Sequence, residues 1–367
     1  MTSIYNKIGN QLGLIGGLII FIALLLIPAP QGLSNAAWFT AAVTILMGIW
    51  WITEAIPIAV TALVPIVLFP VLGVSSISEA TTPYANPLIF LFMGGFIIAL
   101  AMEKWDLHKR IAISIVSYVG IKPSSIIIGF IISAAFLSMW VSNTATAIMM
   151  LPIAMSILEL VDREEGSDKI NFEIVLVLSI AYACNIGGMG TLIGTPPNAL
   201  LAGFMLDNYG IEISFIDWMM VGVPIILISL PLMYLMLTKF IYPIKIKELP
   251  GGKQLIQKQL EALGAISSEE KKVATVFVGA ALMWICRPLI ANYIPGISDA
   301  GIAIGAAVLF FLIPSNLKEN VFLLRWSDTK RLPWGVLILF GGGLSMASAI
   351  RSTGLAEWIG GGIGSLN

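Results

Sequence analysis

The sequence predicts an all-α polytopic membrane protein, and its composition, its apolar segments and its charge distribution all support that class. Hydrophobic residues make up 58% of the 367 residues, whereas charged residues make up only 11%. The mean hydropathy is +0.94, well outside the usage of soluble globular chains. The formal net charge of −1 argues against nucleic acid as a partner, because such partners select basic surfaces.

Apolar segments long enough to cross a bilayer recur along the chain. We expect spans near 12–29, 37–53, 57–73, 87–102, 170–201 with an internal break, 218–240, 270–292, 298–313 and 335–350. The segment 123–161 forms either two full spans or a re-entrant hairpin. About 20 residues lead from Pro123 to Ser142, and the turn tip carries no charge, Pro or Gly. A loop in water usually contains such residues, so the hairpin is favoured.

The positive charges predict the orientation. With a cytoplasmic N-terminus, every Lys and Arg except Arg287 and Arg351 falls in an inside segment. The outside segments 30–36, 74–86, 202–217 and 293–297 contain none. By the positive-inside rule, we expect a multi-pass protein of the cell membrane with its N-terminus in the cytoplasm.

Two polar interruptions at membrane depth form the candidate solute site. The first is Ser142-Asn143-Thr144 at the hairpin tip, and the second is the Gly-, Thr- and Pro-rich segment 187–198. Irregular backbone at membrane depth is tolerated only where it lines a cavity or is covered by protein. Either motif alone would more often serve helix packing. Both together are the pattern of paired discontinuous helices around a solute.

Ionisable side chains are almost absent from the predicted spans, where Glu54 and Arg287 are the main exceptions. A proton-driven transporter needs an intramembrane relay of Asp, Glu or His. An intramembrane enzyme would need a nucleophile with a base, or a metal cluster. The only histidine, His108, lies in the amphipathic stretch 103–112, and we expect it on a solvated interfacial surface. The sequence therefore predicts that the protein is not an enzyme.

Oxygen atoms at the two interruptions can bind sodium, because hydroxyls, amides and backbone carbonyls satisfy a hard cation. Ser138 and Ser142 are one helical turn apart, so we expect both hydroxyls to face the same way. Asn143 and the carbonyls exposed around Gly194 and Thr195 complete this oxygen set.

A compact dianion can be held at the same place without Lys or Arg. The helix after the hairpin tip and the helix that begins at Pro196-Pro197 should direct unpaired N–H groups and positive dipole ends at the cavity. Each helix end supplies only about half a charge. Bound sodium would complete the neutralisation, so sodium and anion are expected to bind together.

A hydrophilic linker divides the chain, and we expect four segments. They are scaffold helices with an interfacial helix at 1–122, a transport-domain half at 123–243, a cytoplasmic linker at 244–269 with an amphipathic stretch at 253–263, and further scaffold helices at 270–367. Aligning residues 92–107 with 340–355 matches Gly94-Gly95 with Gly342-Gly343. The two segments are expected to cross the membrane in opposite directions, as an inverted repeat requires. The same alignment puts a second Ser-Asn-Thr beyond Asn367. The chain is thus expected to hold one repeat and the opening of a second.

These motifs resemble the divalent anion:sodium symporter family of di- and tricarboxylate transporters. The resemblance rests on 142–146, 186–198, 51–57 and 332–335, and it extends over nearly the whole chain. It implies an inverted-repeat secondary transporter and homodimer with a re-entrant hairpin and a broken helix. Such a transporter imports C4-dicarboxylates such as succinate, malate or fumarate with sodium by an elevator mechanism.

The resemblance also implies the roles of particular residues. The implied substrate contacts are Ser142, Asn143, Thr144, Thr195 and Pro196, and the implied sodium ligands are Ser138, Ser142, Asn143 and Gly194. Sodium, a small dicarboxylate, the bilayer and a second copy are the expected partners. Family members carry a second hairpin and a second broken helix outside these 367 residues, so a protein ending at Asn367 is not expected to transport.

Two alternatives stay open. A sodium-coupled transporter of sulfate or another oxyanion would have the same architecture, because hydroxyls and helix ends recognise any compact dianion. A non-transporting membrane scaffold would result if the two motifs served only packing.

Overall fold

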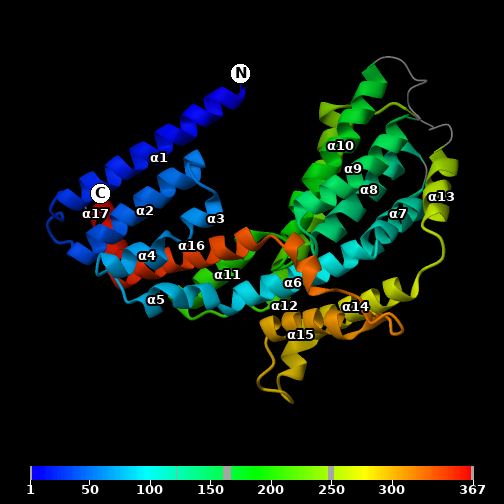
Figure 1. The fold of residues 1–367 in the computed structure, drawn as a ribbon. Coiled ribbons are helices and arrows are strands. Elements are labelled where there is room, and N and C mark those ends of the chain that lie inside the picture. The colour runs from blue at the N-terminus through cyan, green and yellow to red at the C-terminus, as the bar shows by residue number, and fades with distance from the viewer. Residues whose placement is uncertain (1, 121, 160–166, 247–251, 365–367) are drawn as a thin grey trace. The chain divides into compact units, whose positions relative to one another are not determined.

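The computed structural model describes residues 2–120, 122–159, 167–246 and 252–364. Apart from one two-stranded antiparallel pair, the regular structure of these residues is helical (Figure 1). Within them, seven helices are long and apolar enough to cross a membrane, which confirms the prediction of an all-helical membrane protein. The chain divides into two compact units, 1–90 with 333–367, and 91–332.

The first unit is built around the antiparallel pair α1 and α2. Its helices are α1 (Thr2–Leu26), α2 (Asn35–Thr53), α3 (Ile58–Thr61), α4 (Val64–Val71), α5 (Ile77–Thr81), η1 (Thr82–Ala85), α16 (Trp334–Ser352) and α17 (Leu355–Gly364). Ser34 caps the N-terminus of α2, and Glu54 ends it in a left-handed conformation. Side chains of α1, α2, α4, α5 and α16 form the core, in which Met47 and Phe69 are fully buried.

The prediction of one continuous span at 57–73 is wrong. The structure has the short helices α3 and α4 there, separated by Ala62 and Leu63. Pro65 stands in the first turn of α4, where a missing N–H does no harm. In a continuous helix its ring would collide with the carbonyl four residues earlier, at Thr61. Pro65 therefore favours a helix start at this place, whereas Pro70 is accommodated inside α4.

The second unit contains the hairpin and the helix break. Its elements are α6 (Pro87–Lys104, in this unit from Leu91), α7 (Leu107–Val119), α8 (Pro123–Ser138), α9 (Asn143–Leu158), α10 (Ser167–Gly188), α11 (Pro196–Tyr209), α12 (Phe215–Leu235), η3 (Met236–Ile241), α13 (Gly252–Ala262), α14 (Ser268–Ile290), α15 (Asp299–Leu312), β1 (Pro314–Asn316), β2 (Val321–Phe322) and η4 (Trp326–Arg331). Helix α10 is central and packs on α8, α9 and α12. Phe130 and Phe172 are fully buried in the core between them.

Two helix interruptions occur where the sequence predicts them. Helices α8 and α9 meet at the turn 139–142, and the seven residues 189–195 separate α10 from α11. Helices α8 and α9 have 16 residues each, which gives a length of about 24 Å. That length falls short of the roughly 30 Å hydrocarbon core of a bilayer. Such short helices are expected of a hairpin that enters the membrane and returns to the same side.

One glycine of each aligned pair lies at a close backbone contact within its own unit. A Cβ atom at Gly94 would stand 2.6 Å from the backbone of Ala303. A Cβ atom at Gly342 would collide with the carbonyl oxygen of Ala62. Approach at this distance requires glycine, so Gly94 and Gly342 serve packing in the structure, whereas a Cβ atom at Gly343 would meet no atom within 4 Å.

Trp140, at the hairpin tip, is buried in an aromatic cluster. Its ring stacks on Phe215 and Trp284, with centroids 6.0 and 6.3 Å away, and meets the edge of Phe277 at 5.0 Å. Phe215 and Trp284 stack on each other at 4.6 Å. The cluster joins the hairpin tip to α12 and α14. Trp140 thus serves the packing of the hairpin tip.

His108 is not solvated, contrary to the prediction. Its side chain is 5% exposed, and Nδ1 lies 3.0 Å from the carbonyl oxygen of Met102. The backbone turns at Asp106, which has a left-handed conformation, and α7 then packs on α8. Burial lowers the pKa of His108, which favours the neutral imidazole.

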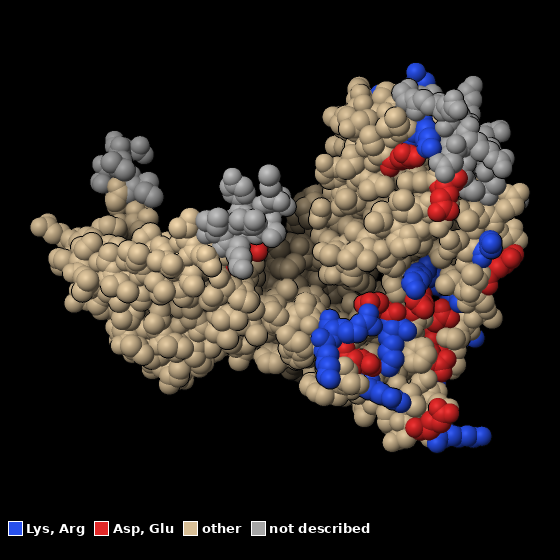
Figure 2. Space-filling model, turned by 45° about the horizontal axis from the view of Figure 1, so that its top comes forward, with Lys and Arg blue, Asp and Glu red and all other residues tan. Residues whose placement is uncertain are grey.

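Charged side chains gather in one region of the second unit (Figure 2). Three ion pairs join segments that are distant in sequence, namely Lys104–Asp328 at 2.7 Å, Arg110–Glu270 at 2.7 Å and Arg331–Glu103. Arg110 also donates to the carbonyls of Leu263 and Gly264 at 3.0 and 3.1 Å. One guanidinium thus ties α7 to the end of the linker helix α13 and to the start of α14.

We expect Arg110→Ala to lower the unfolding temperature, because it leaves the carboxylate of Glu270, itself 5% exposed, without its cation. Removing one partner of a buried pair costs about 3–5 kcal/mol, and partial exposure of Arg110 should bring the loss to about 2–3 kcal/mol. Thermal unfolding in detergent micelles measures it. Lys109→Ala is the control, because Lys109 pairs with Asp106 on the exposed surface. Equal losses in the two variants would contradict the assignment.

Candidate functional site

The hairpin tip begins where α8 ends. Helix α8 ends at Ser138, and Ser142 caps α9 by accepting the N–H of Ala145 at 3.3 Å. Ser138 is fully buried, and its hydroxyl donates to Oδ1 of Asn143 at 2.5 Å. The carboxamide of Asn143 therefore lies across the hairpin turn rather than along α9.

The prediction that the hydroxyls of Ser138 and Ser142 face the same way is wrong. It assumed one helical turn between the two residues, but the chain leaves the helix at Met139. Ser142 then has extended backbone angles and belongs to the next helix. As a result Ser138 is buried, whereas Ser142 is exposed at the helix N-terminus.

The broken helix is held in shape by side chains that bind its free carbonyls. Asn198 is 6% exposed, and its Nδ2 donates to the carbonyl oxygens of Gly188 at 2.9 Å and Thr191 at 2.7 Å. Trp218 Nε1 donates to the carbonyl oxygen of Met189 at 2.8 Å. Buried carbonyls without donors are costly. These bonds therefore fix the course of the chain between α10 and α11.

The two interruptions are in contact. A Cβ atom at Gly188 would stand 2.6 Å from Oδ1 of Asn143. A Cβ atom at Gly194 would collide with the carbonyl oxygen of Gly188. Thr191 donates its hydroxyl to the carbonyl of Met139 in the hairpin turn. The structure thus brings three of the predicted residues, Ser138, Asn143 and Gly194, to one place.

Neutral oxygens converge at this point. The hydroxyl of Ser138 lies 2.5 Å from the amide oxygen of Asn143, and the backbone of Gly188 packs against that amide oxygen. Among the described residues, no three His, Cys, Asp or Glu side chains come together as a metal site. Such an oxygen set suits a monovalent hard cation, and it offers no ligand typical of zinc.

The other predicted residues stand at the edges of this cluster. Ser142 and Thr144 are exposed at the first turn of α9, and Thr195 and Pro196 are partly buried at the start of α11. No side-chain hydrogen bond joins Thr144 or Thr195 to the cluster in the described parts of the chain. Their roles toward a substrate remain predictions.

The prediction of free N–H groups at the start of α11 needs correction. Its first two residues are Pro196 and Pro197, which have no N–H, and the N–H of Asn198 binds the carbonyl of Thr195 at 3.2 Å. The dipole of α11 still points its positive end at the break. Helix α9 differs, because Asn143 and Thr144 stand in its first turn, where N–H groups have no intrahelical acceptor.

Sequence reasoning missed two asparagines. Asn185 accepts a hydrogen bond from Nδ2 of Asn143 at 3.0 Å, and Asn198 braces the break. Asn198 belongs to the predicted motif but had no assigned role. The signal for both was available, because a carboxamide in an apolar helix beside a glycine-rich break needs a polar partner.

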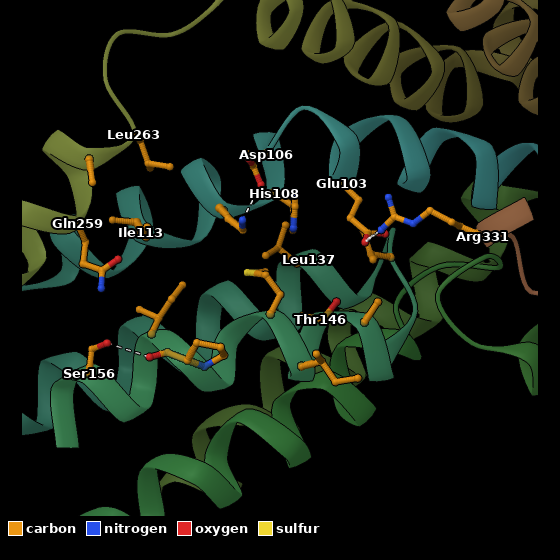
Figure 3. A pocket seen from close by; sticks show the side chains of 18 residues that line it. Glu103, Asp106, His108, Ile113, Leu137, Thr146, Ser156, Gln259, Leu263 and Arg331 are labelled. Carbon is orange, nitrogen blue, oxygen red and sulfur yellow. Dashed lines mark hydrogen bonds and ion pairs between the residues drawn. The ribbon is translucent and has the colours of Figure 1, made fainter. Parts of the chain in front are cut away.

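A separate cavity of about 770 Å³ lies between α7, α9 and α13 (Figure 3). Thr146 and Leu137 line it on the hairpin side, and Glu103, Asp106 and His108 line it on the other. None of the predicted site residues is among the lining residues. This cavity therefore does not contain the oxygen cluster.

The fold and the two linked interruptions define a multi-pass helical membrane protein with a polar, uncharged site. Residues 10–366 match the family described as "Sodium:sulfate symporter transmembrane region". The chain belongs to this symporter family. Its membership confirms the resemblance to divalent anion:sodium symporters and the prediction of a transporter rather than an enzyme.

The relatives carry a more specific description. The chain is 44% identical over 368 residues to "Sodium-dependent dicarboxylate transporter SdcS" of Staphylococcus aureus strain USA300. This alignment covers 98% of the chain and 71% of the relative. The proteins of that name from strains NCTC 8325 and COL have the same identity and coverage.

We expect Gly194→Ala to destabilise the protein, because the new Cβ would press on the backbone carbonyl of Gly188, which cannot rotate away. Overpacking of this kind costs about 1–3 kcal/mol. Thermal unfolding in micelles tests it against Gly279→Ala in α14, where a Cβ meets no atom within 4 Å. The control should be neutral or more stable, because alanine favours a helix. A neutral Gly194→Ala variant would show that the break is looser than described.

Proposed function

We propose that this protein is a sodium-dependent dicarboxylate symporter. The contact between the hairpin tip at Asn143 and the helix break at Gly188 is the observation that carries the proposal. It gathers neutral oxygens next to two helix N-termini. Family membership and the described transport of the 44% identical relatives support it.

Charge balance gives sodium its place in this proposal. A dicarboxylate brings two negative charges to a site that the described residues line with neutral groups. The two helix ends contribute about half a charge each. Sodium ions held by Ser138, Ser142, Asn143 and Gly194 would supply the remainder, and they would bind as co-transported ions. Ser142, Asn143, Thr144, Thr195 and Pro196 would then face the substrate carboxylates.

The same proposal includes the architecture of the membrane domain. Helices α8 and α9 form a re-entrant hairpin, and the chain follows an inverted repeat in which Gly94 corresponds to Gly342. Both glycines support this, because each allows a close helix contact in its own unit, at Ala303 and Ala62 respectively. Segments 1–122 and 270–367 serve as scaffold, 123–243 as the moving half, and 244–269 as the linker, in a homodimer that imports C4-dicarboxylates by an elevator motion.

A cytoplasmic N-terminus completes the proposal. The segments assigned to the inner side, 103–110, 263–272 and 325–331, are joined by ion pairs and hydrogen bonds in the second unit. Arg287 instead binds Glu212 and Asp299, at 2.6 and 3.1 Å, among segments assigned to the outer side. These two groups of contacts fit the orientation that the positive-inside rule predicts.

Sulfate transport is the second candidate, because the description of the family carries that anion. The relatives, in contrast, are described as dicarboxylate transporters. A site built from hydroxyls, amides and helix ends recognises dianions through shape and distance between charges, so the two substrates differ mainly in length.

We expect sodium-driven uptake of labelled succinate by proteoliposomes carrying the full-length protein, and excess succinate should compete far better than excess sulfate. Asn143→Ala should reduce uptake at least tenfold, because it removes a proposed ligand of both ion and substrate. Sulfate as the better competitor would favour the second candidate. Unchanged uptake by Asn143→Ala would favour a packing role for the motif.

Sodium should be required for anion binding itself. We expect calorimetric titration of succinate into the purified full-length protein to give heat in sodium chloride and none in choline chloride at equal ionic strength. The physical reason is the incomplete neutralisation of the dianion by two helix ends. Equal succinate affinity in the two buffers would refute the charge argument.

A further inference from the structure

Asn185 lies opposite the hairpin tip on α10, one turn before that helix ends at Gly188. Its Oδ1 accepts a hydrogen bond from Nδ2 of Asn143 at 3.0 Å. On its other side, the carboxamide of Asn143 presents Oδ1 to the buried hydroxyl of Ser138 at 2.5 Å. The three side chains form a line from a fully buried serine to an exposed asparagine.

The direction of this line matters because a carboxamide can turn over and exchange its oxygen for its nitrogen. With Oδ1 inward, Asn143 offers a lone pair to the cluster at Ser138 and Gly188. With Nδ2 inward, it would offer two N–H donors there, and those repel a cation. Ser138 does not select between these states, because a hydroxyl can both donate and accept.

The space beside Gly188 does not select between the two orientations of the Asn143 carboxamide either. The absent side chain of Gly188 leaves room for the end of the Asn143 carboxamide, and oxygen and nitrogen are nearly equal in size. With Oδ1 of Asn143 directed inward, its nitrogen needs an acceptor, and Oδ1 of Asn185 supplies one. If both carboxamides turned over, Asn185 would donate instead and Asn143 would direct N–H groups at the ion, so a bound cation favours the arrangement in which Asn185 accepts.

We propose that Asn185 is a positioning residue of the sodium site, and that it holds the amide oxygen of Asn143 toward the ion by accepting the hydrogen bond from its nitrogen. This inference rests on the proposed function, because it assigns a role toward the ion in that site. None of the motifs that carry the family resemblance includes Asn185, so its role comes from the contact alone.

Two substitutions separate an acceptor from a space-filling group. Asn185→Leu keeps the approximate volume and removes the acceptor. Asn185→Asp keeps the acceptor and cannot donate when ionised. The matched control is Asn171→Leu, because Asn171 lies on the same helix and donates one hydrogen bond, to the carbonyl of Pro243 at 3.0 Å, away from the site.

The readout is the unfolding temperature of the full-length protein, which should rise with the concentration of sodium chloride. Choline chloride keeps the ionic strength constant across the titration, and no anion substrate is present. Ligand that binds only the folded state produces such a rise. We expect Asn185→Leu to raise the half-saturating sodium concentration roughly three- to tenfold, the effect of one hydrogen bond. Asn185→Asp should bind sodium at least as tightly as the unsubstituted protein. The control Asn171→Leu should have the same sodium affinity as the unsubstituted protein.

Succinate binding gives a second readout that a merely structural role would not move. The added carboxylate of Asn185→Asp should weaken succinate binding while sodium binding is retained, because it repels the dianion. An unchanged sodium affinity in Asn185→Leu would overturn the inference. An equal loss of sodium affinity in Asn185→Leu and Asn185→Asp would also overturn it. If the unsubstituted protein itself shows no sodium-dependent rise and no sodium-dependent uptake, the proposed function fails instead.

Discussion

Backbone groups left free where helices break must find partners away from water, and this constraint organises the centre of the second unit. Asn198 meets it by donating to the carbonyls of Gly188 and Thr191, and Trp218 does the same for Met189. Gly194 then fits directly against Gly188. These hydrogen bonds hold the loop between α10 and α11, which contacts the hairpin turn through Thr191.

This bracing also restricts which oxygens can face a ligand. The carbonyl of Gly188 already accepts a hydrogen bond from Asn198. The carbonyl of Thr191 accepts two, from Asn198 and from the N–H of Gly194 at 3.3 Å, so its two lone pairs are occupied. Ser138 and Asn143 belong to the hairpin, and their oxygens meet this braced surface from the other side. A site shared between two such elements would change its geometry if the hairpin and α10 shifted against each other, which links packing to ion binding.

Several features of the fold follow from local chemistry, and others do not. Ser142 followed by a helical segment indicates a helix start, and Pro196-Pro197 after a glycine-rich run indicates another, because both arguments concern only neighbouring residues. The burial of His108 and the splitting of 57–73 at Pro65 were not anticipated. The burial of His108 depends on the tertiary packing around the start of α7. The split at 57–73 depends on Pro65, which disfavours an uninterrupted helix despite the apolar pattern.

The sequence alone determined the class of the protein, the positions of both interruptions and the residue types that line them, because composition, helix signals and helix breakers act within a few residues. It could not determine that Asn143 would meet Asn185 and Gly188, or that Ser138 would be buried while Ser142 is exposed. Those facts were decided by the packing of α8 and α9 against α10. Residues 138 and 188 lie far apart in the chain, and only tertiary contacts set the orientation of a side chain across such a separation.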